Sequence, residues 1–140
     1  MTAGINRQTG WKPHVVCEFV DITKETLRYW RNTVHPKEAC KSYSSYDILI
    51  YLVIKELVED HGVQLARLKE IDWNDILQEF SNISFLGLDK KTINFDLKNI
   101  RFDLYDSLDE FDYLKGYNHF LDLGKHSKQV LNKLMNYGMN

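Results

Sequence analysis

Three basic side chains recur at helical spacing near the N-terminus: Lys24, Arg28 and Arg31. On a helix that advances about 100° per residue, these positions lie within about 60° of one another. Leu27 and Trp30 lie on an adjacent side, so one face of the helix can pack on a core while the other presents cations. DNA phosphates and guanine edges accept hydrogen bonds from such side chains. The spacing indicates a DNA-facing helix, although an ordinary solvated helix face has the same pattern.

The elements that must position this face are predicted to be helices separated by short polar breaks. The pattern predicts helices over Pro13–Val20, Lys24–Arg31 and Ser45–Glu59. Thr23 can cap the second helix, and Ser44 with Asp47 forms a capping box for the third. The apolar run Ile48–Ile54 also fits a buried strand, but the capping signal favours a helix. Gly62 ends this helix, and helical spacing resumes at Val63 and is expected to end at Ser81-Asn82.

The pattern changes to alternation after residue 80. Ile93, Phe95 and Leu97 alternate with polar residues, and a second alternating run follows the turn at Lys98-Asn99. These residues predict a two-stranded hairpin with one apolar face, and Ile83–Phe85 is a candidate third strand. Helical spacing returns around Leu108, Phe111 and Leu114 and again over Ser127–Tyr137. The predicted fold class is therefore α+β.

The order of two helices, a loop and a third helix suggests a winged helix-turn-helix, and three segments resemble the MerR family of transcription regulators. T-K-E-T-L-R-Y-W-R, over 23–31, resembles the family's second helix. K-S-Y-S-S-Y-D, over 41–47, is similar to the end of its wing and the start of its third helix. E-D-H-G-V-Q-L-A-R-L-K-E-I is similar to its glycine-bearing turn and fourth helix. The resemblance covers about residues 13–72.

The resemblance implies a role in DNA binding for particular side chains. Arg28 and Tyr29 would contact DNA, Lys41 would reach toward the backbone or the minor groove, and Tyr43 would touch phosphate or brace the wing. Lys24 and Arg31 join this set from the angular argument. The full predicted DNA-binding set is Thr23, Lys24, Arg28, Tyr29, Arg31, Lys41 and Tyr43.

The chain departs from the family in two places. The loop Asn32–Ser42 lacks the wing tip rich in glycine and arginine, and Glu38 within it would repel phosphate. The family's long dimerising helix is replaced by the strand pattern after Phe80. The family's sensing of metals or small molecules is therefore not expected here.

Composition excludes several classes of protein. The formal net charge of -2 excludes bulk electrostatic coating of nucleic acid or of an anionic membrane. Cys17 and Cys40 are too few for a disulfide scaffold, and the longest apolar run, Ile48–Ile54, is far short of the ~20 residues that span a bilayer. We expect a cytoplasmic protein without membrane association.

The residues offer little support for catalysis or for a metal site. His35 and Cys40 lack the spacing of usual zinc ligands. His119 and His126 flank Asp122, but no nucleophile elbow, P-loop, HExxH or GxGxxG accompanies them. We therefore expect no enzyme activity, no catalytic residue, no metal and no cofactor.

Together these features predict a MerR-like winged helix-turn-helix domain over residues 1–80 and a strand-plus-helix module over 81–140. The predicted function is sequence-specific binding of double-stranded DNA by a bacterial or phage transcription regulator. The second module would form a homodimer or bind a protein partner. Two alternatives stay open: an architectural, excisionase-like DNA binder, and a protein–protein adaptor built on a winged-helix scaffold.

Overall fold

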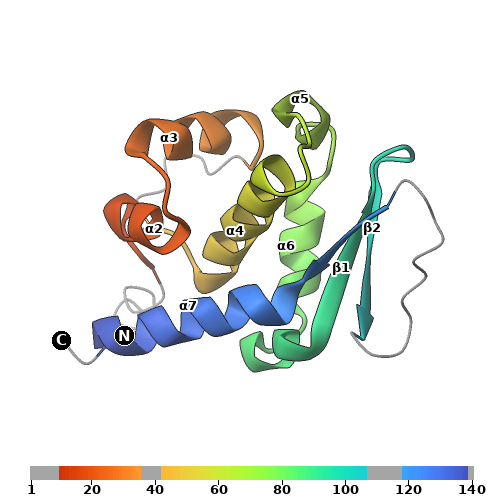
Figure 1. Cartoon of the computed structure of the whole chain (residues 1–140). Helices are drawn as coiled ribbons and strands as arrows, with labels where there is room; N and C mark the ends of the chain where they lie inside the picture. The colour runs from red at the N-terminus through yellow and green to blue at the C-terminus, as the bar shows by residue number, and fades with distance from the viewer. Residues whose placement is uncertain (1–9, 36–41, 107–117, 139–140) are drawn as a thin grey trace.

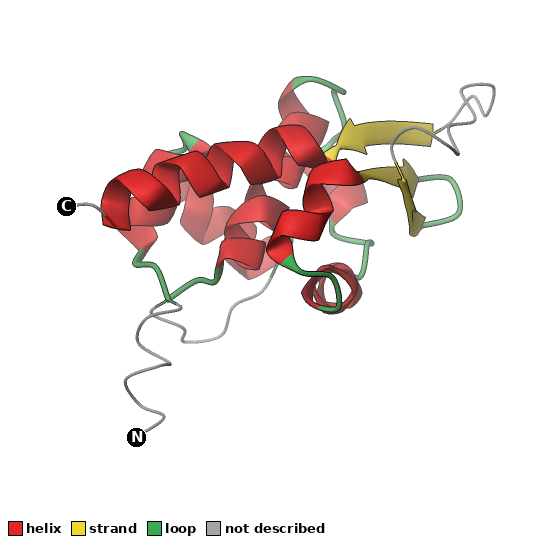
Figure 2. Ribbon diagram, turned by 90° about the horizontal axis from the view of Figure 1, so that it is seen from below, coloured by secondary structure: helices red, strands yellow, loops and turns green. Residues whose placement is uncertain are grey.

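The computed structural model describes residues 10–35, 42–106 and 118–138 and has an α+β architecture. Helices occupy one side of the molecule and a small antiparallel sheet the other, and the C-terminal helix runs from the sheet beneath the other helices (Figure 1). The view from below shows the same separation of helices from strands (Figure 2). In chain order the elements are α2 Pro13–Val20, α3 Lys24–Thr33, α4 Ser45–Glu59, α5 Leu65–Leu68, α6 Trp73–Ser81, η1 Phe85–Lys90, β1 Lys91–Asp96, β2 Arg101–Asp106, β3 Asn118–Asp122 and α7 Leu123–Gly138.

Helix α4 is apolar on nearly all sides and lies at the centre of the fold. Residues 48–54 and Leu57 are all buried, and α4 contacts α2, α6, α7 and β3. Ser44 accepts a hydrogen bond from the Asp47 amide, and the Asp47 carboxylate accepts one from the Ser44 amide. This capping box starts the helix at Ser45, so the predicted helix is confirmed and the strand alternative is wrong.

The two preceding helices also form where the sequence predicts them. Helix α2 has the predicted bounds, with Pro13 in its first turn. Helix α3 starts after the Thr23 cap and continues two residues past the predicted end, to Thr33. Asp21 joins the helices with a φ of 63°, a left-handed conformation that aspartate adopts more readily than most residues.

The sheet confirms the predicted hairpin and adds a strand that the sequence analysis missed. Strands β1 and β2 are antiparallel, with Ile93 opposite Leu104 and Phe95 opposite Phe102. The strand order is β2-β1-β3, so β3 pairs with the other edge of β1. The prediction of a strand at Ile83–Phe85 is wrong, because Ser84 caps the Gly87 amide and starts the 3-10 helix η1.

Three other helical predictions need correction or fall outside the described residues. The helical stretch expected from Val63 to Ser81-Asn82 ends where predicted but is two helices, because Asp72 caps a new start at the Asp75 amide. Helix α7 begins at Leu123, earlier than the predicted Ser127. The helix predicted around Leu108, Phe111 and Leu114 lies outside the described residues.

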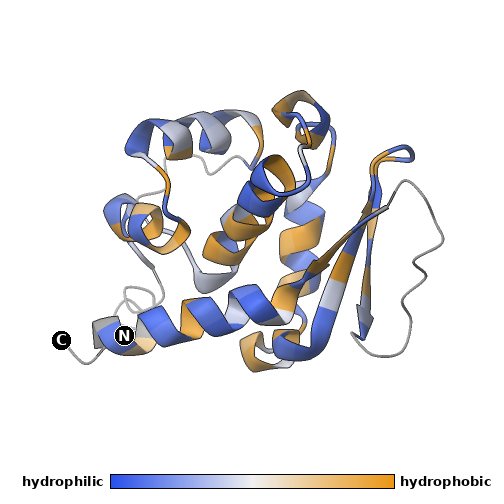
Figure 3. Cartoon of the chain, in the orientation of Figure 1, coloured by the Kyte–Doolittle hydropathy of each residue, from blue (hydrophilic) through white to orange (hydrophobic). Residues whose placement is uncertain are grey.

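One cluster of buried apolar residues runs from Val15 in α2 to Val130 in α7. Figure 3 shows apolar segments gathered on α4, whereas polar and apolar residues alternate along α7. Helix α7 therefore presents one side to α4 and the other to solvent. The boundary between two domains that the sequence predicts near residue 80 stays a prediction. No helix among the described residues is long and apolar enough to cross a membrane.

Gly124, at the start of α7, marks a close approach between α7 and η1. A Cβ atom at this position would lie 2.2 Å from the backbone oxygen of Asp89. We expect Gly124→Ala to lower the free energy of unfolding by about 1–3 kcal/mol, because the backbone must move to admit the methyl group. Urea denaturation followed by circular dichroism measures this change. An unchanged unfolding midpoint would contradict the close packing of α7 on η1.

Candidate nucleic-acid interface

Helix α3 is held on one side by two buried apolar residues. Leu27 is 3% exposed and Trp30 is 5% exposed, and both belong to the main core. Helix α2 packs against α3 and supplies part of this core through Val15, Val16 and Phe19. Because these anchors fix the rotation of α3, they also fix which of its side chains face solvent.

The three predicted cations lie together on the outer side of α3. Lys24 and Arg28 are exposed and Arg31 is partly exposed. They line one shallow hollow of about 250 Å³, whose other lining residues are Pro13, Leu27 and Tyr43. Within residues 10–35, 42–106 and 118–138, no acidic side chain forms an ion pair with any of the three. Three uncompensated cations around an open hollow form a site for an anion.

Every residue that lines this hollow comes from positions 13–43. Within the described parts of the chain, the C-terminal half therefore contributes nothing to its lining. Tyr29 is 51% exposed on the same helix, and its ring and hydroxyl are accessible from solvent. The α3 surface therefore offers three cations and one exposed phenol to a partner.

Thr23 has a structural role that restricts what it can contact. Its hydroxyl oxygen accepts a hydrogen bond from the Thr26 amide at 3.0 Å, and its hydroxyl donates to Thr26 Oγ1 at 2.9 Å. Both interactions close the first turn of α3. Thr23 therefore belongs to the framework of the helix. It is also exposed, and its place in the DNA-binding set stays a prediction.

We expect Thr23→Ala to lower the free energy of unfolding by about 1 kcal/mol, because the Thr26 amide loses its capping acceptor. The matched variant Thr23→Ser keeps the hydroxyl and should stay close to the wild type. Equal stability of the alanine variant and the wild type in urea denaturation would rule out the capping role.

Two roles were predicted for Tyr43, contact with phosphate or bracing of the wing. Its side chain is 1% exposed, its ring packs edge-on against Tyr51, and its backbone pairs with Trp11 through two hydrogen bonds of 2.8 Å. Although Tyr43 lines the hollow, so little of its side chain is exposed that these contacts favour the bracing role. Lys41, the other residue predicted for this loop, lies outside the described residues.

His35, which the sequence analysis left without a role, is fully buried. Its Nε2 lies 3.1 Å from Asp47 Oδ1, and the Tyr51 hydroxyl donates to its backbone oxygen at 3.2 Å. This pair ties the end of α3 to the start of α4. Burial of a histidine between two helices has no local signature, so spacing alone does not reveal it.

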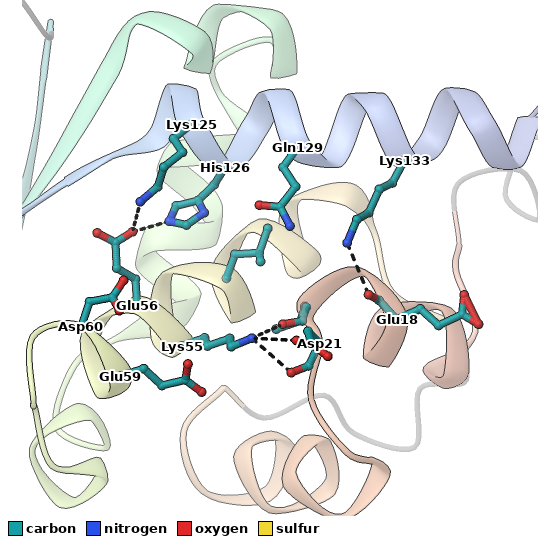
Figure 4. A pocket seen from close by; sticks show the side chains of 12 residues that line it. Glu18, Asp21, Lys55, Glu56, Glu59, Asp60, Lys125, His126, Gln129 and Lys133 are labelled. Atoms are coloured by element: carbon teal, nitrogen blue, oxygen red, sulfur yellow. Dashed lines mark hydrogen bonds and ion pairs between the residues drawn. The ribbon is translucent and has the colours of Figure 1, made fainter.

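A second, larger groove of about 500 Å³ lies between α2, α4 and α7 (Figure 4). Two lysines on its walls bind the last carbonyls of α2. Lys55 donates to the backbone oxygens of Val20 and Asp21, and Lys133 donates to that of Phe19 at 3.0 Å. These lysines satisfy carbonyls that the end of a helix leaves unpaired.

Glu56 is the centre of a charged network at one end of this groove. Its carboxylate accepts a hydrogen bond from His126 and lies 3.4 Å from Lys125 Nζ (Figure 4). Burial alone would raise the pKa of Glu56, but His126 and Lys125 more than offset this and hold the pKa below its ordinary value. His61 Nε2 lies 3.6 Å from the same carboxylate. The network joins α4 to α7.

The structure separates the residues that the sequence suggested as a hydrolytic cluster. His126 contacts Glu56, His119 contacts His61, and Asp122 accepts a hydrogen bond from the Gly124 amide. Burial, together with the neighbouring His61, lowers the pKa of His119. Glu56 and His61 were not singled out by the sequence analysis, because their partners lie 58–70 residues away along the chain.

No protein-family model matches the chain, and no curated protein matches it either. Among the described residues, no group of three or more His, Cys, Asp or Glu side chains gathers to hold a metal ion. The function must therefore be inferred from the residues themselves and from their geometry.

Proposed function

We propose that the chain binds double-stranded DNA through the outer face of α3, as a MerR-like winged helix-turn-helix transcription regulator. The observation that carries this proposal is the hollow lined by Lys24, Arg28 and Arg31, without an acidic partner among the described residues. A helix that presents cations outward and anchors itself through Leu27 and Trp30 has the chemistry required to lie in a major groove.

Electrostatics makes the proposed binding local and dependent on salt. The whole chain carries a formal net charge of -2, so attraction to DNA must come from the α3 face rather than from the protein as a whole. A few contacts with phosphates release a few counterions, and affinity falls as salt rises. The resemblance of residues 23–31 to the MerR second helix supports the same face and adds Tyr29 to it.

Arg28 offers the sharpest test of this function. We expect Arg28→Ala to weaken binding to a duplex by about 1–3 kcal/mol and to reduce the slope of log affinity against log salt by about 1. Fluorescence anisotropy of a labelled random duplex at about 50 and 200 mM salt measures both quantities. The control is Arg101→Ala, which removes the same charge from an exposed arginine on β2, one that lies 3.5 Å from Asp96 Oδ2.

Two outcomes would contradict the proposal. One is the absence of binding at the lower salt concentration by the folded wild-type chain. The other is an equal loss of affinity in the Arg28 and Arg101 variants, which would point to unspecific charge rather than to the α3 face. Circular dichroism of each variant shows whether its fold is intact.

Dimerisation through residues 81–140 forms part of the proposal, because the α3 face of a single chain offers few cations. A homodimer would place two α3 helices about 34 Å apart, one turn of the duplex, and so would double the contacts. We expect multi-angle light scattering to give twice the 16.6 kDa mass of one chain. A monomer at every protein concentration, with or without duplex, would rule out the homodimer.

A further inference from the structure

Two histidines from distant parts of the chain meet beside the Glu56 network. His61 follows the end of α4 and His119 lies in β3, 58 residues later. Their Nδ1 atoms are 3.0 Å apart, and their ring planes are inclined by 61° with centroids 5.1 Å apart. The geometry turns one nitrogen of each ring toward the other ring.

The surrounding charges determine which nitrogen of His61 is free. Glu56 Oε2 lies 3.6 Å from His61 Nε2, beyond hydrogen-bond distance but close enough for the carboxylate to favour the tautomer with the proton on Nε2. The lone pair of His61 is then on Nδ1, directed at His119. Glu56 is itself held by His126 and Lys125, so its orientation does not depend on His61 alone.

The distance between the two Nδ1 atoms is close to the distance between two nitrogen ligands of one metal ion. Zinc–imidazole bonds are about 2.0–2.1 Å long, so two nitrogens on one tetrahedral ion stand about 3.3 Å apart. The observed separation of 3.0 Å needs to widen by only a few tenths of an ångström. A carboxylate that accepts the other N–H of a ligating imidazole is the usual support for such a ligand.

We propose that His61 and His119 bind a divalent first-row transition ion, Zn²⁺ in the experiment below, through their Nδ1 atoms. Imidazole nitrogen suits Zn²⁺, Ni²⁺ and Cu²⁺, whereas Mg²⁺ and Ca²⁺ require oxygen ligands. No third ligand joins the pair within the described parts of the chain, so water completes the coordination. The side chain of His61 is 23% exposed, which leaves a path for the ion.

The site has a structural consequence that is independent of DNA binding. A bound ion would fasten β3 to the end of α4, and an ion that binds only the folded chain stabilises it by mass action. Glu56 is then a positioning residue, because it acts on the ion through His61.

Isothermal titration of the full chain with Zn²⁺ alone, in a buffer that does not chelate metals, tests this proposal. We expect one ion per chain, and at least tenfold weaker binding in His61→Asn and in His119→Asn. Glu56→Gln should weaken binding about tenfold while leaving both ligands in place. The matched control His14→Asn, which alters an exposed histidine on α2, should bind as the wild type does, and Mg²⁺ should not bind.

A measurement on the wild type covers the case in which the variants fail to fold. The electron paramagnetic resonance spectrum of the Cu²⁺-loaded chain should show hyperfine splitting from two imidazole nitrogens. No binding of Zn²⁺ in stoichiometric excess would overturn the proposal and leave the pair as a simple hydrogen bond. Binding that survives in a folded double variant of His61 and His119 would overturn it as well.

Discussion

Burial of the apolar surface of α4 is the constraint on which the rest of the structure depends. A helix with apolar residues on nearly all sides cannot face solvent, so each side needs a covering element. Helices α2, α6 and α7 cover these sides, and β3 contacts the same helix. The position of α3 follows, because it packs on α2 and shares its core. The cationic face is therefore outward as a consequence of how a central helix is covered.

Local signals were sufficient for α2, α3 and α4 and for the hairpin. Ser44 and Asp47 placed the start of α4, Thr23 placed that of α3, and alternation placed the two strands of the hairpin. Each of these signals involves residues close together in the chain. Physical interactions of this kind act within a turn or across one hairpin, and a single sequence records them directly.

Features that depend on residues far apart in the sequence were not predicted. Strand β3 has no clear alternation of its own and exists because Phe120 and Leu121 lie opposite Asn94 and Ile93 in β1. Tyr43 lies in a segment predicted as a loop, and its burial depends on Trp11 and Tyr51, which are distant in the sequence or in another element. Lys24, Arg28 and Arg31 were predicted as a group, because the helical period alone places them on one side.

The last carbonyls of α2 accept hydrogen bonds from lysines on two different helices, Lys55 on α4 and Lys133 on α7. Only residues 21–23 separate α2 from α3. Residues of the C-terminal helix therefore help to anchor the helix on which the arginine-bearing α3 packs.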